Sequence, residues 1–81
     1  MDQIQQLEKI VQLGKEISRS SGKDVFLRYL YEFLAKGFDR NLFVIMLMKY
    51  RLLDKSTYAL VDMLEDKEVL KLLIDSILSS S

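Results

Sequence analysis

Three carboxylate side chains, Asp62, Glu65 and Asp66, stand close together in the sequence. Their i, i+3 and i+4 spacing places all three on one face of a helix. Such a face can bind a hard cation weakly through oxygen ligands. No loop of alternating carboxylates or carbonyls accompanies them, so we interpret them as a solvated acidic face beside a helix end and expect no metal site.

A glycine-lysine pair, Gly22-Lys23, raises the question of a phosphate-binding loop. The pattern G-x-x-x-x-G-K-[ST] requires a glycine at position 17 and a serine or threonine at position 24. The chain has Ile17 and Asp24 instead. The pair is therefore better interpreted as part of a turn between two helices.

The remaining polar residues do not form a recognisable catalytic group. The chain has no histidine and no cysteine, which excludes disulfides and the usual imidazole or thiolate metal sites. Ser20 and Ser21 lie near Lys15 and Lys23, but turn formation and helix capping explain these serines. We predict that the protein is not an enzyme and uses no cofactor.

The elements that carry these residues are helices. The chain has no proline, its three glycines separate apolar segments with helical spacing, and no segment alternates as a half-buried strand does. This pattern predicts an all-α fold, a compact bundle of four to five short helices in a single domain, residues 1–78. The expected helices span about residues 2–18, 23–36, 40–53, 56–65 and 67–78, and a frayed serine tail follows at 79–81.

Several residues mark the expected helix ends. Gly37 is expected to stop the second helix, Asp39 to cap the third, Asp54 or Ser56 to cap the fourth, and Asp66 to cap the fifth. A change in the phase of the apolar residues predicts the break before Asp66. Gly14 leaves two interpretations open. Inside the first helix it either costs up to about 1 kcal/mol of helix propensity or allows a neighbour to approach closely.

The third helix contains "LFVIMLM", residues 42–48, seven apolar residues without a polar interruption. This run is too short to cross a bilayer, which takes roughly 20 residues. Two interpretations remain: a central hydrophobic helix at about 40–53 that the others surround, or a helix partly covered by a partner. We favour the second, because the other helices offer little material to cover it, and take Phe43, Met46, Leu47 and Tyr50 as candidate protein-interface residues.

The charge distribution and the N-terminal sequence narrow the remaining classes of protein. Residues 1–55 carry ten basic and seven acidic groups, a net +3, and residues 56–81 carry two basic and five acidic, a net −3. This imbalance falls short of the basic footprint of a dedicated nucleic-acid binder. The first residues do not resemble a signal peptide, so we expect an intracellular, cytoplasmic protein without membrane contact.

Residues 54–70 read "DKSTYALVDMLEDKEVL", which resembles the recognition helix of winged-helix repressors of the multiple-antibiotic-resistance regulator type. The resemblance implies a helix-turn-helix with residues 56–65 as recognition helix. It places DNA contacts at Ser56, Thr57, Tyr58 and Ala59. Separately, the nearby basic residues Lys49, Arg51 and Lys55 could contact phosphates. The glycine of the preceding turn is replaced by Leu52-Leu53, and no wing segment follows.

Two functions therefore emerge from the sequence. The first is a small, non-catalytic protein-protein interaction module that forms a homodimer or acts as an accessory or regulatory subunit of a larger protein complex. The alternative is a helix-turn-helix DNA-binding regulator. The first relies on the apolar run at residues 42–48, and the second on the phrase that begins at Asp54.

Overall fold

The computed structural model describes residues 3–80 and contains helices without any strand in that range. The predicted all-α fold is confirmed. Five α-helices and one 3-10 helix follow in chain order: α1 (Gln3–Arg19), α2 (Lys23–Lys36), α3 (Arg40–Lys49), α4 (Lys55–Leu60), η1 (Val61–Glu65) and α5 (Lys67–Ser79). None of the described helices is long and apolar enough to span a membrane.

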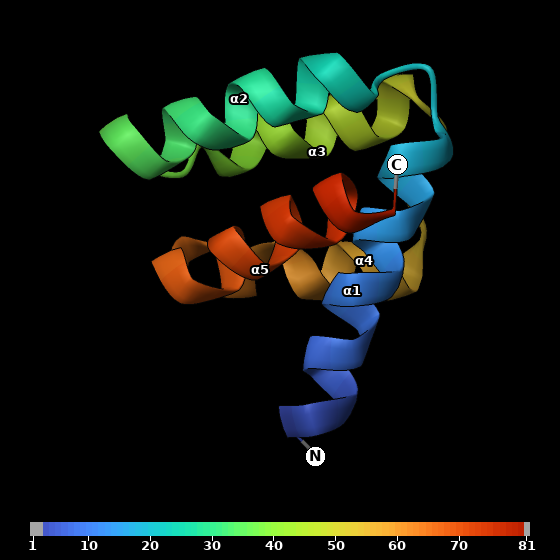
Figure 1. Ribbon diagram of the computed structural model, residues 1–81, viewed down its shortest axis with the longest axis vertical. Coiled ribbons are helices and arrows are strands. Elements are labelled where there is room, and N and C mark those ends of the chain that lie inside the picture. The colour runs from blue at the N-terminus through green and yellow to red at the C-terminus, as the bar shows by residue number, and fades with distance from the viewer. Residues whose placement is uncertain (1–2, 81) are drawn as a thin grey trace.

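The central helix is α5. It packs most extensively against α1 and also contacts α2 and η1, and it lies between the α2–α3 pair and α4 (Figure 1). One of the two interpretations of the sequence placed α3 in this position because of its unbroken apolar run. In the structure α3 lies at the edge of the bundle, and its Ile45 and Met48 side chains are exposed. The most apolar segment of the chain is therefore not the most buried one.

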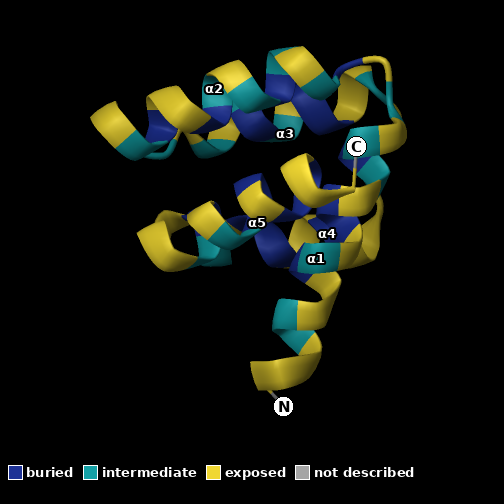
Figure 2. Ribbon diagram, in the orientation of Figure 1, coloured by how far each residue is buried: buried dark blue, intermediate teal, exposed yellow. Residues whose placement is uncertain are grey.

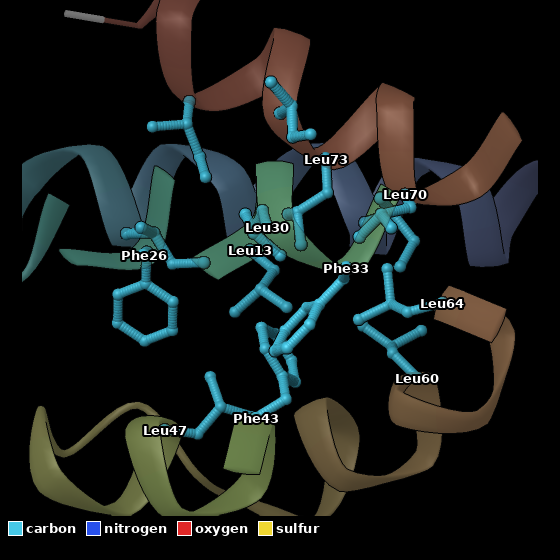
Figure 3. Packing of buried hydrophobic residues seen from close by; sticks show 14 of the residues in the cluster. Leu13, Phe26, Leu30, Phe33, Phe43, Leu47, Leu60, Leu64, Leu70 and Leu73 are labelled. Carbon is cyan, nitrogen blue, oxygen red and sulfur yellow. The ribbon is translucent and has the colours of Figure 1, made fainter. Parts of the chain in front are cut away.

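The core draws side chains from every helix. Leucine, isoleucine and phenylalanine dominate it, and the residues labelled in Figure 3 converge from α1, α2, α3, α4, η1 and α5. Exposed and buried residues alternate along each helix with helical spacing, so that buried stripes face inward (Figure 2). Burial of these stripes supplies the main favourable free energy of folding.

The caps predicted at Gly37, Asp39, Asp54 and Asp66 are confirmed, whereas α2 begins after Gly22 without a side-chain cap from a serine. The carboxylates of Asp39 and Asp66 accept hydrogen bonds from the backbone N–H groups of Leu42 and Glu68, at 3.0 and 2.9 Å. Gly37, with φ of +116°, ends α2. The predicted break before Asp66 is also present, although residues 56–65 do not form one α-helix, because the chain tightens into η1 after Leu60.

The end of α3 differs from the prediction. The helix stops at Lys49 rather than near residue 53, because Arg51 adopts a left-handed conformation with φ of 58°. The Leu52 N–H then donates to the Leu47 carbonyl at 2.8 Å, and the Arg51 N–H donates to the Met48 carbonyl at 3.1 Å. This pattern is the Schellman motif, in which glycine usually takes the position of Arg51.

Gly14 serves a close helix-helix contact. A Cβ atom at this position would overlap the Cβ of Ser76 and would lie 3.2 Å from the Ser76 carbonyl carbon and 3.3 Å from the Ile77 nitrogen. Of the two interpretations of Gly14, the structure supports close approach. The small residues Gly14 and Ser76 bring α1 and α5 almost into backbone contact.

The predicted helix bounds near the chain ends differ slightly from the structure. α5 runs through Ser79, so this residue belongs to the helix rather than to the predicted frayed tail, and Ser80 forms the C-cap. Residue 2, the expected start of the first helix, lies outside the described residues, as does residue 81 of the tail. Within the described part, α1 continues to Arg19, one residue beyond the prediction.

Candidate functional site

The apolar run at residues 42–48 divides between the core and the surface. Phe43, Met46 and Leu47 are buried, with exposed fractions of 0, 5 and 0%. Ile45 and Met48 are 59 and 60% exposed. Three of the four interface candidates therefore belong to the core of this chain, and the apolar surface of α3 comes from Ile45 and Met48 instead.

Ile45 lines a groove between α2 and α3 of about 340 Å³. We call it the α2–α3 groove. Two of the predicted interface residues, Met46 and Tyr50, also line it, whereas Phe43 and Leu47 lie in the core. Its lining is mostly apolar and aromatic and consists of Val25, Arg28, Tyr29, Leu42, Ile45, Met46, Lys49 and Tyr50.

The charged groups of the α2–α3 groove are both basic. The Arg28 guanidinium lies 5.9 Å from the centre of the Tyr29 ring, and the Lys49 ammonium lies 5.6 Å from the centre of the Tyr50 ring. Within residues 3–80, neither cation has a carboxylate oxygen within 4.0 Å. The groove therefore presents an apolar floor with unneutralised positive charge beside it.

Aromatic side chains pack against one another between α2 and α3. The Phe26 ring centre lies 6.0 Å from that of Phe43, at 79° between the ring planes, and 5.5 Å from that of Tyr50. The Phe26–Phe43 contact is edge-to-face, and such a contact stabilises beyond the area that it buries. Tyr50 in turn packs against Gly22, where a Cβ atom would lie 2.7 Å from the ring.

A second groove lies between α1 and α5 and measures about 540 Å³. We call it the α1–α5 groove. The first half of α1 extends beyond the rest of the bundle, and its first buried residue is Ile10 (Figures 1 and 2). The lining comprises Ile4, Leu7, Glu8, Val11, Gln12, Lys15 and Leu72.

The sequence reasoning did not single out the α1–α5 groove. The signal was present, because Ile4, Leu7 and Val11 follow one another at helical spacing along α1. The same spacing places them on the apolar half of α1 together with Ile10, Leu13 and Ile17, which are buried. The sequence does not show that α1 reaches past the helices that cover its second half.

Most of the residues predicted to contact DNA are exposed, but Thr57 is not. Its side chain is 4% exposed, accepts a hydrogen bond from the Asp54 N–H at 2.7 Å and can donate to the Leu52 carbonyl at 3.0 Å. The Asp54 carboxylate accepts from the Thr57 N–H at 2.8 Å, which completes a capping box. Thr57 therefore holds the start of α4 and is not available to a ligand.

The other residues predicted to contact DNA lie in different parts of the structure. Lys49 lines the α2–α3 groove, Arg51 ends α3, and Lys55 and Ser56 are exposed at the start of α4. α4 itself has six residues, and the Ser56 hydroxyl donates to the Asp54 carboxylate at 2.8 Å. These hydrogen bonds hold the pKa of Asp54 below its ordinary value, the backbone N–H of Thr57 being the main cause. The Asp54 charge therefore persists beside Ser56 near neutral pH.

Tyr58, the last of these residues, lies under the Arg40 side chain. The Arg40 guanidinium carbon is 5.1 Å from the Tyr58 ring centre, and its Nε donates to the Asp62 carboxylate at 2.8 Å. This bond to Asp62 is the main cause that raises the pKa of Arg40. The pair links α3 to η1 on the surface.

The carboxylates at 62, 65 and 66 do not come together as a metal site. No group of three or more metal-ligating side chains is close enough to hold an ion anywhere in residues 3–80. Asp62 pairs with Arg40, and Asp66 caps α5. Their placement at helix ends explains their sequence positions.

No family model, curated protein or solved structure matches the chain.

Proposed function

We propose that the protein is a non-catalytic protein-protein interaction module whose α2–α3 groove receives a helix of a partner protein. The observation that carries the proposal is the exposed Ile45 in a groove lined mainly by apolar and aromatic side chains. The same lining holds Arg28 and Lys49, which have no carboxylate oxygen within 4.0 Å in residues 3–80. A groove between two helices is a common receptor for the apolar face of an amphipathic helix. Binding without chemistry suits an accessory or regulatory subunit of a larger complex.

The energetics favour contact at Ile45. Its side chain is 59% exposed, and fully burying a large aliphatic side chain contributes about 1.5–3 kcal/mol relative to exposure. Met46 and Tyr50 extend the apolar contact along the floor. The thioether of methionine adapts to partners of different shape. Ile45 is therefore the expected anchor position of the interface.

The charges beside the groove define the partner. Arg28 and Lys49 have no carboxylate within 4.0 Å among the described residues, so a partner carboxylate finds both available. Attraction of opposite charges accelerates encounter and fixes register. The partner helix should therefore carry an apolar ridge flanked by aspartate or glutamate.

The proposal can be tested with a displayed library of helical peptides selected on the full chain. We expect enrichment of peptides with apolar residues at i, i+3 or i+4 and i+7 and with flanking acidic residues. Ile45→Lys should weaken their binding at least about tenfold, because a buried aliphatic contact is lost. Fluorescence anisotropy of one labelled peptide measures the effect.

Met48→Lys is the matched control. Met48 lies on the same helix, is exposed to the same degree as Ile45 and does not line the groove, so its substitution should leave binding within about twofold. A selection without enrichment, or equal loss in both variants, would contradict the proposal. Met46→Lys is unsuitable as a test, because Met46 is 5% exposed and its substitution buries a charge.

A further inference from the structure

Two unusual backbone positions join α3 to its neighbours in the chain. Gly37 precedes it with φ of +116°, and Arg51 follows it with φ of 58°. These are the two positions with positive φ among residues 3–80. Glycine changes its backbone angles at little cost, whereas Arg51 occupies a region that is unfavourable for a residue with a Cβ. Both ends of α3 therefore suit a hinge, because a few element-terminal residues can absorb the change in φ and ψ.

The body of α3 lies against the bundle mainly through side chains. Among the described helices, its backbone comes close to another over several residues only at η1, whereas α5 comes close to α1, α2 and η1. The rings of Phe26, Phe43 and Tyr50 fill the space between α2 and α3. Segments with a low local contact density open before the rest of a fold. α3 is thus the helix best suited to move as a unit.

A surface contact holds the N-terminal end of α3. Arg40, its first residue, donates from Nε to the Asp62 carboxylate of η1 at 2.8 Å, and its guanidinium carbon lies 5.1 Å from the Tyr58 ring centre on α4. We call these three residues the Arg40 latch. Of the two ion pairs between side chains of residues 3–80, this is the one that joins two helices, because Glu68–Lys71 lies within α5. The Arg40 and Asp62 side chains are 36 and 77% exposed, so their contact is weak and reversible.

From these features we infer that α3 is a hinged flap of the α2–α3 groove, which tilts about Gly37 and Arg51 and which the Arg40 latch holds closed. The lining of the groove comes from α2 on one side and from the end of α3 and Tyr50 on the other, so a tilt of α3 changes its width. Phe43 and Leu47 are fully buried, so α3 stays on the bundle while its N-terminal end moves. The motion is independent of the proposed function, and only its use, the admission of a partner helix, rests on that function.

Spin labels measure this motion, because the chain has no cysteine of its own. Asn41→Cys on α3 and Asp75→Cys on α5, both exposed positions, carry the labels, and double electron-electron resonance gives the distribution of distances between them. Asp62→Asn removes the ion pair and keeps the stacking of Arg40 on Tyr58, so the ratio of the long-distance to the short-distance population should rise up to about fivefold. Arg40→Gln should raise this ratio further, because the stacking is lost as well.

The controls separate the latch from a general loss of charge. The double variant, Arg40→Gln with Asp62→Asn, should equal Arg40→Gln alone, because both changes remove the same ion pair. Glu68→Gln removes the ion pair within α5 and should leave the α3–α5 distances unchanged. Labels at Lys9→Cys and Asp75→Cys report on α1 and α5, and their distance should not respond to any latch variant.

Three distance results would overturn the inference. They are identical distributions in the chain and its latch variants, an equal response to Glu68→Gln, and a change between α1 and α5 as large as that at α3. The last result would mean that the whole fold loosens instead of α3 alone.

Peptide kinetics test the use of the flap. A peptide selected on the α2–α3 groove should associate up to about fivefold faster with the Asp62→Asn chain, because the open population is larger. An unchanged association rate would overturn the role of α3 as a flap of the groove. A selection that yields no peptide contradicts the proposed function alone, because the distance measurement uses no peptide.

Discussion

The two grooves are built on opposite packing principles. α1 and α5 meet through small residues, with Gly14 against Ser76, so their backbones nearly touch. α2 and α3 make few close backbone approaches, and the rings of Phe26, Phe43 and Tyr50 fill the space between them. Backbone contacts cannot adjust to a change in volume, whereas side chains can rotate. The α1–α5 contact should therefore be rigid and the α2–α3 contact adaptable.

The adaptable contact matches the partner helix that we propose for the α2–α3 groove. A groove for a partner helix gains from side chains that can repack around different apolar residues. Met46 and Tyr50, on the floor of the α2–α3 groove, can supply that freedom.

The largest expected effect comes from Gly14→Ala. Alanine improves helix propensity by up to about 1 kcal/mol, but its Cβ overlaps Ser76, and overpacking of this kind costs typically about 1–3 kcal/mol. Because the neighbouring atoms include the Ser76 and Ile77 backbone, we expect the cost to exceed the gain and the free energy of unfolding to fall by up to about 2 kcal/mol. Urea denaturation measures it.

Gly22→Ala is the counterpart on the other side of the molecule. Its Cβ would meet the Tyr50 ring at 2.7 Å, and that ring is half-buried and can move away. We expect a loss below about 1 kcal/mol, together with altered peptide binding at the α2–α3 groove. A cost for Gly22→Ala equal to that for Gly14→Ala would contradict the proposed difference in rigidity.

A smaller effect of opposite sign is expected for Arg51→Gly. Arg51 takes a left-handed conformation at the end of α3, which costs a non-glycine residue roughly 1 kcal/mol. Glycine removes that strain but loses more chain entropy on folding, so we expect a net stabilisation of about 0.5 kcal/mol. A rise in thermal midpoint with unchanged helicity would show it, and a fall would indicate that the arginine side chain contributes elsewhere.

The smallest effect is expected at α4, which contributes no lining to either groove and so serves as a reference. Asp54 has a pKa below its ordinary value of 3.8, so its charge contributes stability at neutral pH that is lost as pH falls through the folded-state pKa. Asp54→Asn should therefore lower the thermal midpoint slightly at pH 7, and the difference should vanish in strong acid. A difference that is independent of pH would exclude the charge as its cause.

The sequence predicted the helices well because their ends are chemically marked. Asp39, Asp54 and Asp66 each accept backbone hydrogen bonds at a helix start, and Gly37 supplies the positive φ at the end of α2. Such caps depend on local geometry alone. The end of α3 has no glycine to signal it in the sequence, since Arg51 adopts the left-handed conformation in which glycine is usual.

The candidate surfaces were harder to predict because they depend on packing between distant helices. In an unbroken apolar run, no polar residue marks which side of the helix faces the solvent. The sequence therefore did not distinguish exposed Ile45 from buried Phe43 and Leu47. The sequence also gave no sign that α5 is the central helix, because its polar residues are spaced like those of any surface helix. Only the tertiary arrangement separates the lining of a groove from the core beneath it.

The central place of α5 also sets the order in which the chain can fold during synthesis. The buried face of α1 is covered mainly by α5, so α1 leaves the ribosome before the helix that covers it. Until residues 67–79 emerge, Ile10, Leu13 and Ile17 lack their main cover. The nascent chain therefore exposes the apolar face of α1 until α5 has emerged, and in that interval the face is open to chaperones and to neighbouring chains.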